Sequence, residues 1–238
     1  MTHPSNAADI LASNLARVRE RIDRAAADAG RDRSGIVLVC VSKYVDASLT
    51  ALLATSGELN LGESRPQQLW EKAGASGLQN ARWHLIGHLQ RNKAKRTVPL
   101  TALIHSVDST RLLRAIDSAA AEAGSTAEVL LEVNCSGDAE KHGLDPDGVR
   151  AVLAESQQAE HVQVRGLMTM AAREGGPAEA QRNFASLREL RDELLDAGSA
   201  PEGLPHLSMG MTGDLEAAVA EGSTILRVGS ALWDGLRG

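Results

Sequence analysis

Short apolar runs alternate with helical patterns along the whole chain, and this alternation constrains the fold more than any other feature. Eight runs have the length and apolar content of strands: residues 36–41, 59–61, 83–86, 103–107, 129–133, 162–168, 206–209 and 224–228. The segments between them carry helical patterns: residues 48–56, 66–73, 91–98, 109–123, 145–159, 177–197 and 214–221. A helix between every two strands implies parallel pairing through right-handed crossovers.

Eight such units predict an α/β fold, a single (β/α)8 TIM barrel spanning residues 1–238, with residues 7–29 as an extra N-terminal helix. The rival architecture is an open doubly wound sheet. A G-x-G-x-x-G motif at the first strand-to-helix turn would favour that sheet, and the sequence has none there. No long Pro/Ser-rich linker interrupts the chain, so we expect one domain.

Composition excludes several classes of function. The 238 residues carry a formal net charge of -6, which argues against general nucleic-acid binding. No apolar stretch is long enough to cross a bilayer, and the N-terminus lacks a basic segment followed by an apolar one. The two cysteines, Cys40 and Cys135, lie in or at the end of apolar runs and are interpreted as small buried residues. We therefore expect a cytoplasmic protein without membrane or nucleic-acid partners.

Lys43 follows the first apolar run directly after Ser42. Ligands bind at the carboxyl ends of the strands in alternating strand-helix proteins. An amine held partly out of water at this position would have a lowered pKa and would attack an aldehyde. The alternative is an ordinary exposed lysine at a strand end.

Two loops near the C-terminus have the character of a phosphate site. Ser208 to Asp214 reads Ser-Met-Gly-Met-Thr-Gly-Asp, and Arg227 to Ser230 reads Arg-Val-Gly-Ser. Barrels often bind phosphate after strands seven and eight, where hydroxyls, glycine amides and helix starts face the anion. A Ser/Gly-rich loop alone is usually only a loop. Together with Lys43, however, these loops suggest a phosphorylated aldehyde as the ligand.

Several motifs match one known family: Val41-Ser42-Lys43, Leu61-Gly62-Glu63, Trp83 to Lys93 (W-H-L-I-G-H-L-Q-R-N-K), Ile104 to Ser109, Val133-Asn134, Lys141-His142-Gly143, Gly166-Leu167-Met168, Leu207 to Met211 and Glu221 to Gly229. This set resembles the YggS/PROSC family of pyridoxal-phosphate-binding homeostasis proteins. The resemblance runs from the first strand to the C-terminus. It implies the alanine racemase N-terminal-domain barrel, known as fold type III.

The resemblance implies pyridoxal 5'-phosphate (PLP) as the cofactor, in a Schiff base with Lys43. In that fold type the arginine of R-x-G faces the pyridine nitrogen, which gives this role to Arg227. The phosphate would be held in the last two loops by Ser208, Thr212, Gly229 and Ser230. The matching motifs place four more residues around the cofactor: His84 and Asn134 beside the ring, with Met168 and Met209.

One position departs from the family pattern, and another agrees with it. The family pattern has G-E-N after the second strand, whereas this chain has Ser64, so no asparagine role is carried over to it. Trp233 stands where the family commonly has an aromatic residue near the last strand.

The expected site favours binding over catalysis. A cation beside the pyridine nitrogen keeps the ring unprotonated, which makes it a weaker electron sink. Racemases with this barrel add a second base, a tyrosine from another domain. The chain ends soon after the last strand run, and strand alternation predicts that its single tyrosine, Tyr44, points away from Lys43.

We therefore expect a PLP carrier for intracellular PLP (vitamin B6) homeostasis, with little or no catalysis. The alternative is a PLP-dependent amino-acid racemase or lyase on the same barrel. A third class is a sugar-phosphate aldolase, which also uses a Schiff-base lysine. The expected partners are PLP and PLP-dependent client enzymes, and the expected oligomeric state is a monomer.

Four further signals have weaker implications. The basic segment 91–96 is interpreted as a solvated helix face or as a patch attracting anions. Lys93 and Lys141 could hold a second, non-covalent PLP. His84 and His88 are four residues apart, but a strand followed by a loop does not pair them on a metal. His105, within an apolar run, is interpreted as a hydrogen-bonded core histidine.

Overall fold

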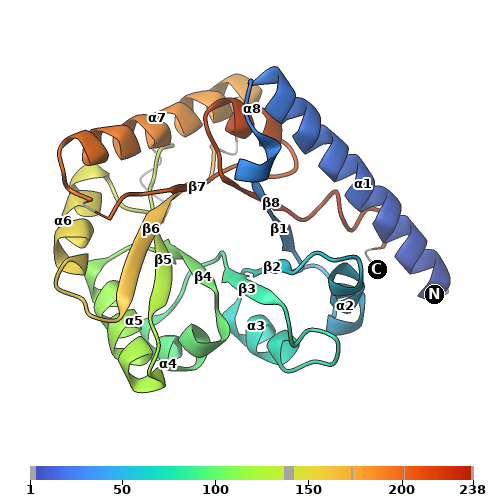
Figure 1. Cartoon of the computed structure of the whole chain (residues 1–238), viewed down its shortest axis with the longest axis horizontal. Coiled ribbons are helices and arrows are strands. Elements are labelled where there is room, and N and C mark those ends of the chain that lie inside the picture. Colours follow the sequence, from blue (N-terminus) through green and yellow to red (C-terminus); the bar gives the residue numbers. More distant parts are fainter. Residues whose placement is uncertain (1–3, 137–141, 173, 201, 237–238) are drawn as a thin grey trace.

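The computed structural model describes residues 4–136, 142–172, 174–200 and 202–236. These residues form a closed barrel whose parallel strands follow one another in chain order (Figure 1). The strands are β1 (Val37–Val41), β2 (Asn60–Glu63), β3 (Arg82–Leu85), β4 (Leu103–Val107), β5 (Ala127–Glu132), β6 (Val162–Met168), β7 (His206–Ser208) and β8 (Ile225–Val228). Since β1 pairs with both β2 and β8, the TIM barrel is confirmed and the open sheet is excluded.

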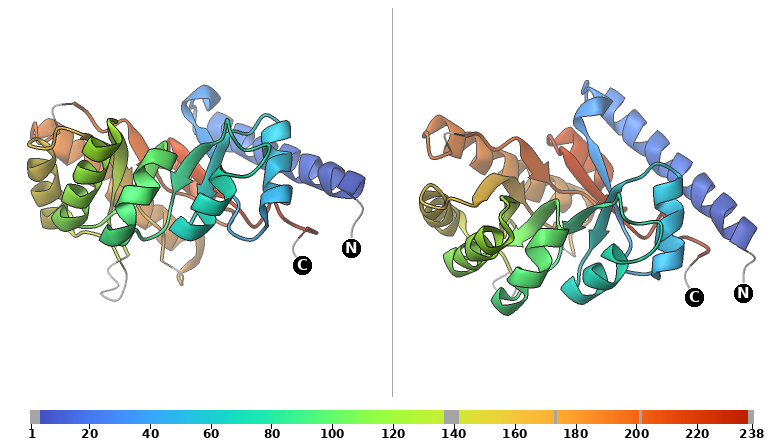
Figure 2. Two further views of the ribbon diagram at one scale, coloured as in Figure 1. Left: turned by 90° about the horizontal axis from the view of Figure 1, so that it is seen from below. Right: turned by 60° about the horizontal axis from the view of Figure 1, so that its bottom comes forward.

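Helices cover the outside of the barrel (Figures 1 and 2). The α-helices are α1 (Pro4–Asp28), α2 (Ala47–Thr55), α3 (Pro66–Ala73), α4 (Ala94–Thr97), α5 (Thr110–Ala123), α6 (Pro146–Ser156), α7 (Gly176–Asp196) and α8 (Leu215–Ala220). Short 3-10 turns precede β1 (Arg33–Gly35) and flank α4 (Arg91–Lys93 and Val98–Leu100). The helix expected over residues 91–98 is therefore a single α-turn between two 3-10 turns, with Pro99 in the second.

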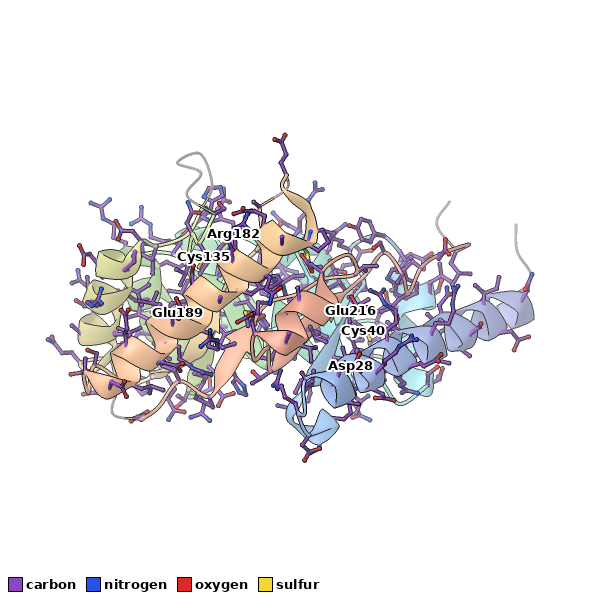
Figure 3. All side chains as sticks on the ribbon, turned by 90° about the horizontal axis from the view of Figure 1, so that it is seen from above. Asp28, Cys40, Cys135, Arg182, Glu189 and Glu216 are labelled. Carbon is purple, nitrogen blue, oxygen red and sulfur yellow. The ribbon has the colours of Figure 1, made fainter. Side chains whose placement is uncertain are left out.

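Helix α1 completes the outer ring rather than lying outside it. Each strand from β1 to β7 is followed by an α-helix, and α1 packs against α8 and α2 in the remaining place. Figure 3 shows α1, α8 and α7 side by side on one face, where Arg21 pairs with Glu216 at 2.9 Å. The Asn14 side chain donates to the backbone oxygens of Leu232 (3.0 Å) and Asp234 (2.9 Å), which ties α1 to the end of the chain.

Local signals explain where these helices begin and end. Ser109 caps α5, because its hydroxyl accepts a hydrogen bond from the Leu112 amide at 3.3 Å. Gly124 ends the same helix with a φ of 63°, a left-handed conformation that favours glycine. Such signals made the helix bounds predictable.

Two hydrophobic cores result from the alternation of side chains along the strands. An inner apolar cluster lies within the barrel and consists of Val39, Leu103, Leu130, Met168 and Ile225. A larger outer core lies between strands and helices and is mostly aliphatic, with Phe184 and Trp233 as large buried members. Cys40 is fully buried in this outer core as predicted, whereas Cys135 is only partly buried. Within the described ranges, no helix has the length and apolar character needed to cross a membrane.

Candidate functional site

Lys43 lies in the turn after β1, at the carboxyl end of the barrel. Its side chain is exposed, so the amine is not partly withdrawn from water as we predicted. The Nζ atom lies 4.9 Å from the centroid of the Tyr44 ring. The prediction that Tyr44 points away from Lys43 is therefore wrong, because the strand ends at Val41 and its alternation does not reach residues 43 and 44.

The backbone before Lys43 is held from three sides. The buried indole of Trp233 donates to the Val41 oxygen at 2.7 Å. The Ser42 amide donates to the Gly62 oxygen at 2.9 Å, and the Lys72 ammonium donates to the Ser42 oxygen at 2.8 Å. These bonds fix the place from which Lys43 emerges.

A buried ion pair lies beneath this turn. Lys72 Nζ is 2.5 Å from Glu63 Oε1, and the Ser42 hydroxyl donates to the same oxygen at 2.8 Å. The Lys72 and Glu63 side chains are only 6% and 0% exposed. The other oxygen, Glu63 Oε2, is buried without a hydrogen-bond partner among the described residues. Nothing in the sequence pattern indicated that Lys72 would turn inward.

A chain of polar side chains crosses the barrel interior. Arg227 donates to the Ser208 hydroxyl at 2.6 Å and to the Thr169 oxygen at 2.9 Å. Ser208 Oγ lies 2.9 Å from His105 Nδ1, and His105 Nε2 lies 2.9 Å from His84 Nδ1. This confirms His105 as a hydrogen-bonded core histidine.

The direction of this polar chain follows from its two ends. Arginine only donates, and the Asn60 carbonyl oxygen, 3.2 Å from His84 Nε2, only accepts. The consistent assignment is that Ser208 donates to His105, His105 Nε2–H donates to His84, and His84 Nε2–H donates to Asn60. Each imidazole then carries a single proton and is neutral.

Burial explains the charge states of the side chains in this hydrogen-bonded row. It lowers the pKa of His84 to about 3, with Arg82 and His206 lowering it further through like charge. Burial also holds the pKa of His105 well below its usual value, with smaller effects from His84 and Arg227. Arg227 has a pKa lowered by burial to about 10, against the opposing effects of Asp214 and Glu132. Arg227 is therefore the cation of this interior at neutral pH.

The predicted site residues on the strands divide between the two faces of the sheet. Ser208 is fully buried inside the barrel next to Arg227, not in the loops where we expected the phosphate. Met168 belongs to the inner core, as a residue facing the barrel interior. Met209 belongs to the outer core, because it follows Ser208 and points to the opposite face, so its side chain does not line the barrel interior.

The loops after β7 and β8 meet as expected. Thr212 Oγ1 accepts a hydrogen bond from the Ala231 amide at 3.4 Å. Thr212 and Ser230 both line a surface hollow of about 400 Å³ next to α1.

Gly229 allows a close approach between β8 and the turn after β1. A β-carbon at Gly229 would lie 3.2 Å from Val41 Cβ and 3.3 Å from Tyr44 Cε2. The Lys43 turn and the end of β8 are thus in contact through Gly229.

The remaining predicted positions lie on other loops. The Asn134 side-chain oxygen accepts from the amide (3.1 Å) and hydroxyl (2.8 Å) of Ser136, so it helps to shape its own loop. Lys93 ends the 3-10 turn before α4. Lys141 falls outside the described residues.

Comparisons with known proteins agree with this architecture. Residues 7–236 match the family model described as alanine racemase, N-terminal domain. The chain is 37% identical to the pyridoxal phosphate homeostasis protein of Aquifex aeolicus, over 92% of this chain and 95% of that protein. It is 41% identical to the protein of the same name from Deinococcus radiodurans, over 92% of this chain and 97% of that protein.

Solved structures extend the comparison. The PLP-bound structure of PipY, a COG0325 family member from Synechococcus elongatus, has a TM-score of 0.82 and 37% identity and covers 93% of this chain and 99% of its own. Alanine racemase from Clostridium difficile shares only 15% identity at a TM-score of 0.71, and so shows the fold alone. The chain belongs to the YggS/PROSC family of pyridoxal phosphate homeostasis proteins, whose barrel is of the alanine racemase N-terminal type.

Proposed function

We propose that this protein binds PLP at the carboxyl end of its barrel, as a Schiff base on Lys43, and serves intracellular PLP homeostasis with little or no catalysis. The observation that carries the proposal is that Lys43 follows the strand β1, which is the direct neighbour of the strand β8 that carries Arg227. Strand β1, which leads to Lys43, pairs directly with β8, so that Val39 is opposite Arg227 and Cys40 is opposite Val228. An exposed amine and a buried cation therefore belong to neighbouring strands.

The donor set fits the three functional groups of PLP. The amine of Lys43 matches the aldehyde, the Arg227 guanidinium matches the pyridine nitrogen, and the Thr212 hydroxyl with the Gly229 and Ser230 amides matches the phosphate. In forming the Schiff base, the lysine nitrogen bonds to the aldehyde carbon and the aldehyde oxygen leaves as water. We assign Ser208 to positioning Arg227, since its hydroxyl is already bonded there. His84, Asn134 and Met168 remain proposed contacts of the ring.

Arg227 favours storage over reaction. PLP bound in a Schiff base normally serves as an electron sink, and protonation of the ring nitrogen strengthens that sink. A buried guanidinium, held by Ser208 and Thr169, opposes this protonation. The neutral histidines His84 and His105, which continue the hydrogen-bonded row from Ser208, add no charge that would change the protonation of the ring nitrogen.

Tyr44 also argues against racemisation. A racemase needs two bases on opposite faces of its substrate. Tyr44 and Lys43 emerge from the same turn, and the Lys43 ammonium lies against the tyrosine ring. Both side chains would therefore face the same side of a bound substrate. We infer that amino-acid racemase or lyase turnover is slow or absent.

Two experiments test this proposal. Borohydride reduction of the PLP-loaded protein, followed by peptide mass mapping, should place a phosphopyridoxyl group on the peptide containing Lys43. A label on any other lysine would contradict the site. Incubation with L-alanine or L-serine should yield D-isomer or pyruvate well below about 1 per second, and turnover above that rate would favour the enzyme.

Homeostasis further requires that PLP be passed on. The PLP-loaded protein should activate an apo-form PLP enzyme, in proportion to the PLP it loses, and failure to donate would contradict a carrier role. We further propose a cytoplasmic monomer. Light scattering after gel filtration should give the mass of one chain, with a dimer mass as the contrary result.

A further inference from the structure

Three side chains with metal-binding atoms converge at the carboxyl end of the barrel. His88, Asp108 and His142 come from the loops after β3, β4 and β5, and their ligand atoms all lie within 4.8 Å of one another. His88 Nδ1 is 3.3 Å from Asp108 Oδ2. The imidazoles of His88 and His142 are stacked, with centroids 5.2 Å apart and planes at 21°.

The loop that carries His88 is fixed by its neighbours. The Ser106 hydroxyl donates to the Gly87 oxygen at 2.7 Å. Gly87 also lies so close to Ser64 that a β-carbon there would be 2.2 Å from the Ser64 oxygen. The backbone next to His88 therefore has little freedom, while the imidazole itself is 46% exposed and able to turn.

The backbone at Asp108 and near His142 is positioned by the adjoining strand and by backbone hydrogen bonds. Asp108 directly follows the last residue of β4. Near His142, the Leu144 amide donates to the Glu132 oxygen at 2.7 Å, and the Asn134 amide donates to the Leu144 oxygen at 3.0 Å. The three loops thus present their side chains to one point from fixed backbone positions.

The chemistry of this cluster matches a zinc-type ion. Two imidazole nitrogens and one carboxylate oxygen form a ligand set found around zinc, where further positions are left for water or substrate. Around a tetrahedral ion with bonds of about 2.0–2.1 Å, the ligand atoms would be about 3.3 Å apart. Closing from 4.8 Å requires a shift of about 1.5 Å, which exposed side chains can make by rotation.

The surroundings leave room for the open positions. His88 and Asp108 line a surface hollow of about 650 Å³ that extends along residues 88–92 and 108–112. Water or a small anion in this hollow would complete the coordination.

We propose that His88, Asp108 and His142 bind one divalent transition-metal ion of the zinc class. This site shares no residue with the proposed PLP site, and it therefore does not depend on Lys43.

The test uses tag-free, metal-stripped protein and Zn²⁺ as the probe, in competition with a chromophoric chelator. Wild type should bind one Zn²⁺ per chain, and excess Mg²⁺, which prefers oxygen ligands, should not displace it. His88→Ala and His142→Ala should each weaken binding by at least about 100-fold, since even outer-shell changes cost 10- to 100-fold. Asp108→Asn, which keeps the side-chain shape, should also weaken it.

Two controls make the result specific. His161→Ala removes a histidine just before β6, at the opposite end of the barrel, and should bind Zn²⁺ like wild type. Lys43→Ala should do the same, which separates this site from the PLP proposal. Circular dichroism melting checks that each variant is folded. Absence of saturable one-to-one binding, or equal zinc affinity in wild type, His88→Ala and His142→Ala, would overturn the proposal.

Discussion

At the scale of single residues, the interior of the barrel is organised around Arg227. A fully buried guanidinium loses hydration, and only strong partners offset that loss. Here the partners are Ser208 and the Thr169 oxygen, and Ser208 is itself bonded to His105. The two neutral histidines thus orient a hydroxyl that orients the cation. This explains why two imidazoles are buried at positions where burial keeps both of them neutral.

The low pKa of His84 makes stability depend on pH. The unfolded state takes up a proton near the ordinary histidine pKa of 6.5, whereas the folded state does so only near 3. The stabilisation is therefore complete above pH 6.5 and is lost as the pH falls from 6.5 towards 3. His84→Gln should make the fall in unfolding free energy shallower by about 1.4 kcal/mol per pH unit.

Urea denaturation at several pH values between 4 and 6.5 measures this difference. An unchanged slope in His84→Gln would mean that His84 titrates in the folded protein.

At the scale of elements, the carboxyl end of β1 depends on its contacts with β2, α3 and β8. The Glu63–Lys72 pair connects β2 to α3 and also holds Ser42. Trp233 holds Val41, and Gly229 lets β8 approach it. These contacts determine where the Lys43 turn begins.

Removing one partner of the buried pair should be costly. Lys72→Met leaves the Glu63 carboxylate buried without its cation and should lower the unfolding free energy by about 3–5 kcal/mol. The double variant Glu63→Leu/Lys72→Met removes both charges and should lose less than the single variant. Urea denaturation gives both values.

An exposed pair gives the matched comparison. Lys95→Met breaks the surface pair with Glu122 and should leave the unfolding free energy nearly unchanged. If the double variant of the buried pair were less stable than Lys72→Met alone, uncompensated charge would not be the source of the cost.

Gly229 should not tolerate a side chain. In Gly229→Ala the new methyl group would lie 3.2 Å from Val41 Cβ and 3.3 Å from Tyr44 Cε2, so β1 or Tyr44 must move. Such overpacking costs about 1–3 kcal/mol, and we expect weaker PLP binding with it. Gly213→Ala is the control, because no atom lies within 4 Å of its added carbon. Equal PLP affinity of the two variants, measured by absorbance titration, would show that the approach is not critical.

The elements themselves were largely predictable. The predicted runs 103–107 and 162–168 coincide with β4 and β6, because buried parallel strands are nearly continuous apolar segments. The other strands differ from their predicted runs by one or two residues at the ends. Backbone hydrogen bonding, and not hydrophobicity, decides where a strand ends. The predicted direction of Tyr44 was wrong for another reason: it extended the alternation of strand side chains beyond Val41, where the predicted run and β1 both end.

At the scale of the whole molecule, barrel closure creates contacts that no local pattern indicates. Asn60, His84 and His105 lie on the neighbouring strands β2, β3 and β4, and closure of the barrel through β1 and β8 brings Ser208 of β7 against His105. His88, Asp108 and His142 meet because the strands before their loops, β3, β4 and β5, are direct neighbours in the sheet. The position of Lys43 after the first apolar run singled it out, and the motif resemblance supplied Arg227, whereas the partners of Arg227 and the Glu63–Lys72 pair required the three-dimensional arrangement.

The proposed function follows from this arrangement taken as a whole. The amine, the buried cation and the loops that we propose to bind phosphate belong to β1, β7 and β8 and the segments that follow them, which are neighbours in the closed barrel. A carrier needs such a site to be reachable, and the exposed Lys43 meets that need.

The most direct test is the visible absorbance of purified protein with added PLP, before and after borohydride, for wild type, Lys43→Ala and Lys93→Ala. Wild type and Lys93→Ala should show a yellow imine band that borohydride abolishes, and Lys43→Ala should never show it. If Lys43→Ala gave the same band as wild type, PLP would be bound elsewhere, and Lys43 would not be the Schiff-base lysine.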